Sequence, residues 1–183
     1  TLQRLRAYYP EDVNIRFVPF FSSDIETTKF LFITPETQTQ IVTDTTGKKT
    51  EVYVYGMTSP ASLQRSAMGQ SASNLGSIYD MTFSVYKKAV EGEEPLPFST
   101  PISSSQMLDV ICKVSAHEVG HALGLVDAYY LDGVGEKHNP GADDQLKMMN
   151  VSTDLEWMFN AHPPIGWRTL NENYLMFVLP VPK

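Results

Sequence analysis

Three residues between positions 117 and 121 have the types and the spacing that metal-assisted hydrolysis needs. His117 and His121 are four apart, so on an α-helix their imidazoles share a face and two ring nitrogens can reach one ion. Glu118 is offset around the helix, where its carboxylate could reach a water on the metal without binding the metal itself. The surrounding positions are apolar, and two buried imidazoles without partners would be costly. The pattern therefore predicts two metal ligands and a general base on one helix.

A tetrahedral zinc site with two histidines and a water still needs a third protein ligand. Gly124 can take the left-handed conformation that ends a helix and turns the chain sharply, which would bring a residue just downstream back to the metal. Asp127 is three positions past Gly124, and its carboxylate is an acceptable zinc ligand. We therefore predict Asp127 as the third ligand, with His138 and Glu156 as alternatives.

The segment from His117 to Asp127 resembles the signature of the metzincin zinc peptidases, H-E-x-x-H-x-x-G-x-x-H/D. Most metzincins have His in the last position, whereas the snapalysin-like minority has Asp, as this sequence does. Metzincins also have a Met-turn, a tight turn beneath the metal that contains a methionine. Met149 looks most like that residue, and Met148 is the alternative. The resemblance implies a secreted or extracytoplasmic endopeptidase with one catalytic Zn²⁺, which cleaves a peptide, a protein or a glycoprotein.

The same resemblance implies an α+β, metzincin-like single domain. In that fold a twisted mixed β-sheet packs on the active-site helix, and a C-terminal helix follows the Met-turn. Residues 152–162 would be that helix, and Thr153 with Glu156 forms a capping-box pattern at its start. By analogy, residues 78–86, where apolar and polar residues alternate, would be the inner strand. Residues 65–73 would be the edge strand that binds the substrate backbone.

The implied mechanism depends on Glu118 and on the identity of the third ligand. Glu118 takes a proton from water on the metal and then passes it to the leaving amine. A site with two His and one Asp has a lower formal charge than a site with three His, so the metal should be a weaker Lewis acid. Glu118 must then do more of the deprotonation, and we expect activity to peak at neutral to mildly alkaline pH.

Hydrophobic periodicity indicates an α+β fold independently, because strands dominate the first half of the chain and helices the second. The expected elements are a helix stopped by Pro10, strands at 13–20 and 29–34, a hairpin at 40–57 that turns near Gly47, a loop at 91–105, and a helix from the Ser103–Ser105 cap to Gly124. Without that helix the strands would have no apolar cover. We therefore predict one domain over 1–183, with a strand-rich half at about 1–90 and the active-site helix and C-terminal subdomain at about 104–183.

Composition excludes several classes of protein. The chain has 183 residues, of which 42% are hydrophobic and 19% charged, and this balance is typical of a globular domain. A net charge of −7 gives no basic face for nucleic acid or an anionic membrane, and no apolar window is long enough to span a membrane. Cys112 is the single cysteine and lies in an apolar run, so we expect an inert buried thiol. We expect a monomer, and we interpret the start at Thr1 as a processed or trimmed form.

Three further interpretations stay open. The loop at 131–145 has four acidic residues among glycines and could hold Ca²⁺, although a solvated loop is the simpler interpretation. A catalytically inactive module on a peptidase fold would bind a protein or glycan without cutting it. A structural zinc protein would need four protein ligands. Glu118 favours the enzyme, because a module that no longer cuts could lose this residue freely.

Overall fold

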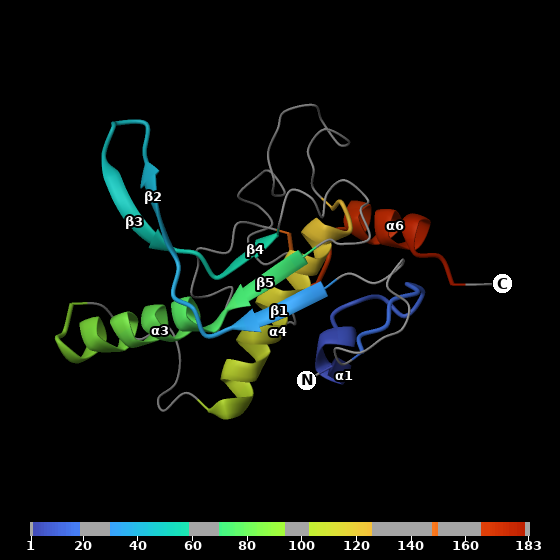
Figure 1. The fold of residues 1–183 in the computed structure, drawn as a ribbon, viewed down its shortest axis with the longest axis horizontal. Helices are drawn as coiled ribbons and strands as arrows, with labels where there is room; N and C mark the ends of the chain where they lie inside the picture. Colours follow the sequence, from blue (N-terminus) through green and yellow to red (C-terminus); the bar gives the residue numbers. More distant parts are fainter. Residues whose placement is uncertain are drawn as a thin grey trace.

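The computed structural model describes residues 2–18, 30–58, 70–93, 103–125, 148–149 and 166–181, and these form an α+β fold (Figure 1). In chain order the elements are α1 (Leu2–Arg6), β1 (Phe30–Thr34), β2 (Thr39–Thr43), β3 (Lys49–Tyr53), β4 (Gly56–Thr58), β5 (Gln70–Asn74), α3 (Leu75–Val90), α4 (Ser104–Ala122) and α6 (Thr169–Val178). None of the described helices is long and apolar enough to cross a membrane.

A three-stranded mixed sheet lies against the long helix α4. Its strand order is β1-β5-β4, in which β5 is parallel to β1 and antiparallel to β4. Helix α4 packs on β5 and β4, and Figure 1 shows it crossing the sheet. The edge strand expected at 65–73 was misplaced, because residues 70–74 form the central strand and residues 65–69 lie outside the described ones. The end of the described sheet beside α4 is instead β4.

The prediction of a strand at 78–86 was wrong, because these residues belong to helix α3. Ser77, Ile78 and Thr82 are buried, and this spacing is that of one helix face. The Thr82 hydroxyl donates a hydrogen bond of 2.7 Å to the carbonyl of Ile78, a contact typical of threonine inside a helix. On a helix, residues two apart stand about 200° apart, so the alternation in this stretch favoured a strand, and the surrounding structure overrode that local preference.

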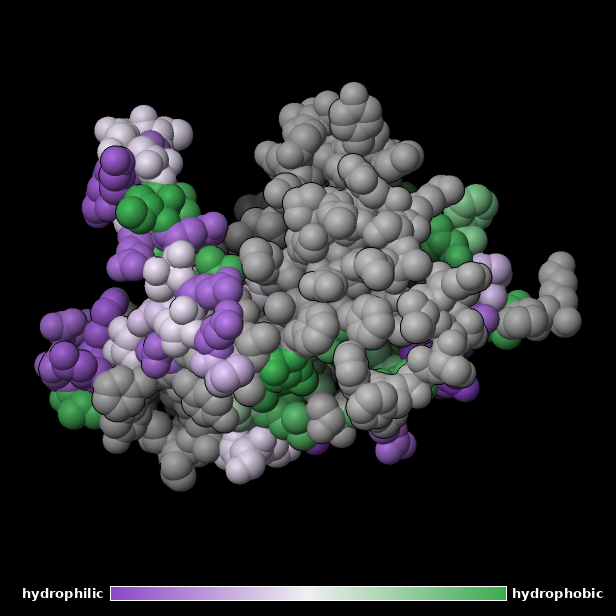
Figure 2. Space-filling view, in the orientation of Figure 1, coloured by the Kyte–Doolittle hydropathy of each residue, from purple (hydrophilic) through white to green (hydrophobic). Residues whose placement is uncertain are grey.

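The hairpin predicted near Gly47 is confirmed as the antiparallel pair β2–β3, and Gly47 has a φ of 84° in its turn. The carboxylate of Asp44 holds the tip together. It accepts hydrogen bonds from the Thr46 amide at 2.8 Å, the Thr46 hydroxyl at 2.6 Å and the Lys48 amide at 2.9 Å. Residues 39–51 are all exposed, and Figure 2 shows mainly hydrophilic side chains on this projecting arm.

The base of the hairpin is tied to the start of α3. The Ser77 hydroxyl accepts from the Gln38 amide at 2.7 Å and donates to the Gln38 carbonyl at 2.9 Å. The Thr37 hydroxyl donates to Asp80 at 2.8 Å. The hairpin is thus fixed at its base and at its tip, while both of its faces are solvated.

No strand forms over residues 13–18, which are the described part of the strand predicted at 13–20, and only Val13 makes a bridge there, to Pro180. The predicted alternation is nevertheless real, because Val13 is buried, Ile15 and Phe17 are half-buried, and the residues between them are exposed. The segment is extended and turns its apolar side to the core. Strand periodicity reports that orientation whether or not a neighbouring strand is present.

The helix predicted before Pro10 is α1, and the turn that follows it brings Tyr8 to a polar cluster on α4. The Tyr8 hydroxyl donates to Asp109 at 3.0 Å, and the buried Lys113 lies 3.6 Å from the same carboxylate. Burial lowers the pKa of Lys113, and burial together with Asp109 raises the pKa of Tyr8. The cluster therefore joins the N-terminal segment to α4 through groups that are costly to bury unless they are paired.

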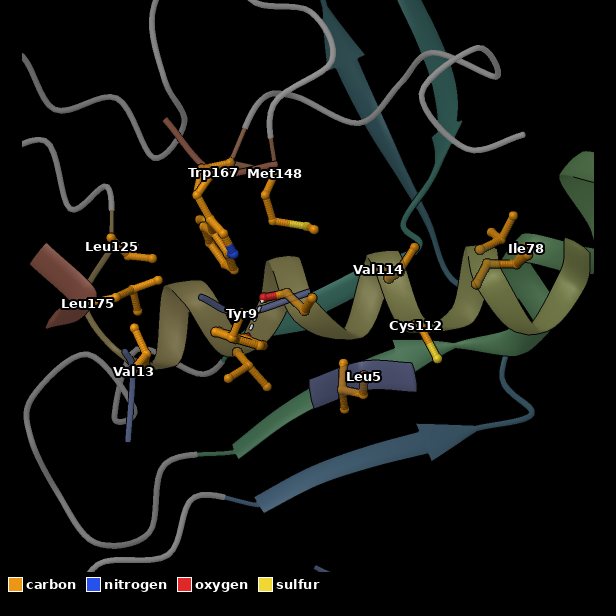
Figure 3. Close-up of a cluster of buried hydrophobic side chains, with 14 residues drawn as sticks. Leu5, Tyr9, Val13, Ile78, Cys112, Val114, Leu125, Met148, Trp167 and Leu175 are labelled. Carbon is orange, nitrogen blue, oxygen red and sulfur yellow. Dashed lines mark hydrogen bonds between the residues drawn. The ribbon is translucent and has the colours of Figure 1, made fainter. Parts of the chain in front are cut away.

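The hydrophobic core surrounds α4 and collects residues from both ends of the chain. Figure 3 shows Trp167 and Met148 on one side of α4, and Leu5 and Cys112 on the other. Helix α6, which the sequence patterns did not indicate, contributes Leu175. Cys112 is buried as expected, and burial raises the pKa of its thiol, so the thiol stays protonated and unreactive.

Candidate metal and proton-transfer site

The site lies on the C-terminal half of α4, most of which is buried. The helix N-cap predicted within Ser103–Ser105 is Ser103, whose side chain forms a capping box with Gln106. Every residue from 112 to 120 is buried. His117 is 4% exposed and Glu118 is 6% exposed. Ionisable side chains are rarely this buried unless they are paired or bound, which makes this stretch a candidate functional site.

The two predicted histidines meet. The Nε2 atoms of His117 and His121 are 3.1 Å apart, and their rings are nearly perpendicular, at 82°. His121 is only half-buried, so the pair opens toward the solvent on its side. Two imidazole nitrogens at this distance can share one hydrogen bond, or each can present a lone pair to one cation.

The orientation of His117 is fixed from outside the helix. Its Nδ1 lies 2.6 Å from the backbone carbonyl of Met148. A carbonyl can only accept, so Nδ1 carries the hydrogen, and Nε2 of the neutral ring keeps its lone pair. The predicted Met-turn region thus touches the site through the backbone of Met148.

Met149 contacts the same helix through its side chain. Both methionines are fully buried. A Cβ added at Gly120 would stand 2.5 Å from Met149 Sδ and 3.2 Å from the ring of Trp167. Glycine at this position therefore lets a sulfur and an indole reach the helix backbone directly. Residues 148 and 149 therefore both contact the part of α4 that bears the histidine pair, and the Met-turn itself stays a prediction.

Glu118 faces the sheet and not the core. A Cβ built on Gly56 of β4 would stand 2.5 Å from Glu118 Oε1, 2.6 Å from its Cγ and 2.8 Å from its Cδ. The carboxylate side chain therefore lies flat across the backbone of the end strand. Tyr55, the residue before Gly56, is half-buried, and burial raises its pKa to about 12. Its hydroxyl consequently keeps its proton throughout the neutral range.

Gly124 ends the helix in the way the sequence predicted. Its φ is 86°, the Leu125 amide donates to the Gly120 carbonyl at 3.0 Å, and the Gly124 amide donates to the His121 carbonyl at 2.9 Å. These two bonds make a Schellman motif, which turns the chain sharply away from the helix axis. The buried Leu125 then fixes the new direction against the core.

Several predicted residues lie outside the described ones: Asp127, His138, Glu156, Thr153, and the loop at 131–145. Within the described ranges, no group of three or more His, Cys, Asp or Glu side chains comes together as a metal site. The described part of the site is therefore a pair of imidazoles with an adjacent carboxylate. The third ligand and the Ca²⁺ loop stay predictions.

Three supporting residues were not foreseen from the sequence: Gly56, Gly120 and Trp167. Both glycines carried a signal, because an isolated glycine in a strand or a helix often marks a close approach by another group. Which group approaches could not be inferred, since both contacts join segments that are distant in the chain. Trp167 carried no signal beyond its aromatic type.

Comparisons of this chain with models of protein families, with curated proteins and with solved structures found no match. The chemistry of the site must therefore be argued from its own residues. Two converging imidazole nitrogens suit a borderline cation such as zinc, and the buried carboxylate of Glu118, the next residue along the helix, can accept and return a proton.

Proposed function

We propose that this protein is a zinc-dependent endopeptidase of the metzincin type, in which His117, His121 and Asp127 hold one Zn²⁺ and Glu118 is the general base. The observation that carries the proposal is the 3.1 Å separation of the two histidine Nε2 atoms on the mostly buried half of α4 that also bears Glu118. Two His and one Glu in this order on a helix are the elements of metal-assisted hydrolysis.

The imidazole pair fits zinc. Two nitrogens that are each about 2.0–2.1 Å from a tetrahedral zinc stand about 3.3 Å apart. The observed 3.1 Å is close to that spacing. The bond from His117 Nδ1 to the Met148 carbonyl is the kind of outer contact that ordinarily orients a metal-binding histidine.

Two features outside the pair support the metzincin type. The Schellman turn at Gly124 redirects the chain three residues before Asp127, as a third ligand on the returning segment requires. Within the described residues the sheet ends at β4, which lies beside α4 and is antiparallel to its inner neighbour β5. An extended peptide could pair along such an end strand with its scissile bond close to Glu118.

Each residue of the site has a separate role in the proposed hydrolysis. Bound zinc would supply Lewis-acid chemistry for water and for the scissile carbonyl. Glu118, lying against Gly56, takes a proton from the attacking water and returns it to the leaving amine. The Met148 carbonyl holds His117 in one tautomer, and the packing of Met149 and Trp167 on Gly120 keeps the helix in place beneath the ligands.

The test is cleavage by the zinc-loaded protein. The parent and the Glu118→Gln variant are incubated with a mixed pool of proteins and glycoproteins, and new termini are identified by mass spectrometry. Glu93→Gln, at an exposed position after α3, is the matched control. We expect new termini from the parent and the control, and none from Glu118→Gln, although all three bind zinc. Chelation should abolish cleavage and added zinc should restore it.

Other outcomes would identify the rival functions. Stoichiometric zinc without any cleavage would favour the binding module, and a zinc site closed by four protein ligands would favour a structural role. Asp127→Ala should weaken zinc binding, whereas Asp127→His should retain it. If Asp127→Ala binds zinc normally while His138→Ala or Glu156→Ala does not, the third ligand has been assigned wrongly.

A further inference from the structure

We propose that Gly56 is a positioning residue for Glu118, because the absence of a side chain at position 56 lets the carboxylate lie against the end strand of the sheet. This inference deepens the proposed function and rests on it for the catalytic role of Glu118. The contact between Gly56 and Glu118 is observed in the structure and does not depend on the proposed activity. Three side-chain atoms of Glu118 stand within 2.8 Å of the point where a Cβ at position 56 would be. Real Cβ contacts essentially never come that close, so any other residue at this position would have to displace the carboxylate.

The requirement for glycine comes from space and not from the backbone. Among the described residues the glycines with positive φ are Gly47, Gly92 and Gly124, and Gly56 is not one of them. An alanine could adopt the φ and ψ of Gly56 without strain. A substitution therefore reports on the contact with Glu118 alone.

The strand cannot easily move away to make room. Gly56 pairs with Ser73 in the antiparallel ladder between β4 and β5, and β5 is held on its other side by β1. A shift of Gly56 would have to break or bend that ladder. The three-stranded sheet therefore acts as a fixed surface beneath the carboxylate.

The helix cannot easily move away either. Glu118 and Gly120 are two residues apart, which places them about 200° apart around α4, on opposite sides. Met149 and Trp167 press on the Gly120 side with no space for even a methyl group. Helix α4 is thus clamped between Gly56 and the Met149–Trp167 pair. An added methyl at position 56 would be accommodated by rotation of the Glu118 side chain.

Rotation of that side chain would act on the chemistry and spare the binding of substrate. The backbone of β4, along which a peptide would pair, keeps its ladder. The carboxylate would leave the place from which it reaches the attacking water, and a displacement of about 1 Å can cost about a hundredfold in rate. Gly56→Ala should therefore lower kcat by about tenfold to a hundredfold, with KM changed by less than about threefold.

The first experiment measures stability and needs no activity. Gly56→Ala, Glu118→Ala and the double variant are made, and thermal unfolding is recorded for all of them. Gly166→Ala is the matched control, since a Cβ there meets no atom of the described residues within 4 Å. We expect Gly56→Ala to lower Tm in the parent and to lower it far less in the Glu118→Ala background. Equal losses in both backgrounds would overturn the proposed contact.

The second experiment measures the kinetics and the rescue of the zinc-loaded enzyme. Glu118→Asp has a shorter side chain, so Gly56→Ala should lower its kcat by a smaller factor than it lowers the kcat of the parent. A general structural defect would lower both values by the same factor. A lower kcat with a retained KM and partial rescue supports positioning, while a raised KM with unchanged kcat overturns it. If the parent itself cleaves nothing, the proposed function fails, and the stability measurement still decides whether Gly56 holds Glu118.

Discussion

Gly124 meets two independent constraints at one position. Its φ of 86° is in the left-handed region, and a Cβ on it would stand 2.8 Å from the hydroxyl of Tyr174. That hydroxyl donates to the carbonyl of Leu123, the last residue before the turn. Helix α6 thus closes over the end of α4 at the residue that redirects the chain toward Asp127.

Gly124→Ala should therefore destabilise the protein through both constraints. An alanine in the left-handed region costs about 1–2 kcal/mol, and the contact with the Tyr174 hydroxyl adds to that cost. Urea unfolding of Gly124→Ala should show the loss, whereas Gly166→Ala should change the free energy of unfolding by less than about 0.5 kcal/mol. In a Tyr174→Phe background, the loss of stability that comes from the contact with the hydroxyl should vanish. The loss that comes from the left-handed backbone should remain. A loss below that of the control would contradict both constraints.

At the residue scale, the local spacing of residues was sufficient to predict part of the site. The pair His117 and His121 could be placed on one helix face because the distance between them is set by the helix itself. The left-handed φ of Gly124 was predictable for the same reason, since only neighbouring residues determine it. The contact between Gly56 and Glu118 could not be predicted, because it depends on the register of β4 beside a helix that is far away in the chain.

The hairpin β2–β3 is held at its tip by a carboxylate and at its base by a hydroxyl, and it has no buried face. A two-stranded sheet is marginal by itself, so these fixed points matter for its order. Hydrogen bonds from the Thr46 hydroxyl and then from the Lys48 amide hold the pKa of Asp44 below its ordinary value of 3.8. The ionised carboxylate is therefore part of the turn.

Acidification should loosen the hairpin tip. Because the pKa of Asp44 is lower in the folded state, its contribution is complete above pH 3.8 and is lost as the pH falls through the lowered value. In an NMR pH titration, the amide protons of Thr46 and Lys48 should shift together with a midpoint below 3.8. Asp44→Asn keeps an oxygen acceptor and should show no such step. A midpoint at or above 3.8 would mean that the carboxylate is not held as the structure describes.

At the element scale, local signals at the ends of elements supported some predictions but did not decide all of them. Ser103 with its capping box and Gly47 in its turn both mark boundaries through interactions within a few residues. Helix α3 also has a signal at its end, because Gly92 has a φ of 77° and the Glu93 amide donates to the Lys88 carbonyl, but its alternating apolar residues favoured a strand. The position of β5 at the centre of the sheet depends on pairing with β1 and β4, which no local pattern records.

The core joins the two ends of the chain around one helix. Leu5, Tyr9 and Val13 reach α4 from the N-terminal segment, and Trp167 and Leu175 reach it from the C-terminal one. The Tyr9 hydroxyl donates to the Ala116 carbonyl at 3.1 Å, and the Trp167 indole donates to the Tyr8 carbonyl at 2.6 Å. The sequence predicted one domain because the strands needed the helix as apolar cover. The structure adds that the N-terminal and C-terminal segments also contact each other.

Helix α6 offers a matched pair of positions for testing whether this core unfolds as one unit. Leu175 is fully buried and Phe177 is 82% exposed on the same helix. Leu175→Ala should therefore lower the free energy of unfolding by about 2–5 kcal/mol, and Phe177→Ala should leave it nearly unchanged.

If the core is a single cooperative unit, the loss of stability caused by Leu175→Ala must also destabilise α4 and not only α6. Native-state hydrogen exchange measures this directly, because the slowest amides exchange through global unfolding. In Leu175→Ala the protection of α4 amides near Val114 and Val119 should fall by the same free energy as the global stability. Faster exchange confined to Thr169–Val178 would show that α6 opens by itself. In that case the helix bearing His117 and Glu118 would owe its stability to the sheet and to α1, with α6 as a separable cover over Gly124.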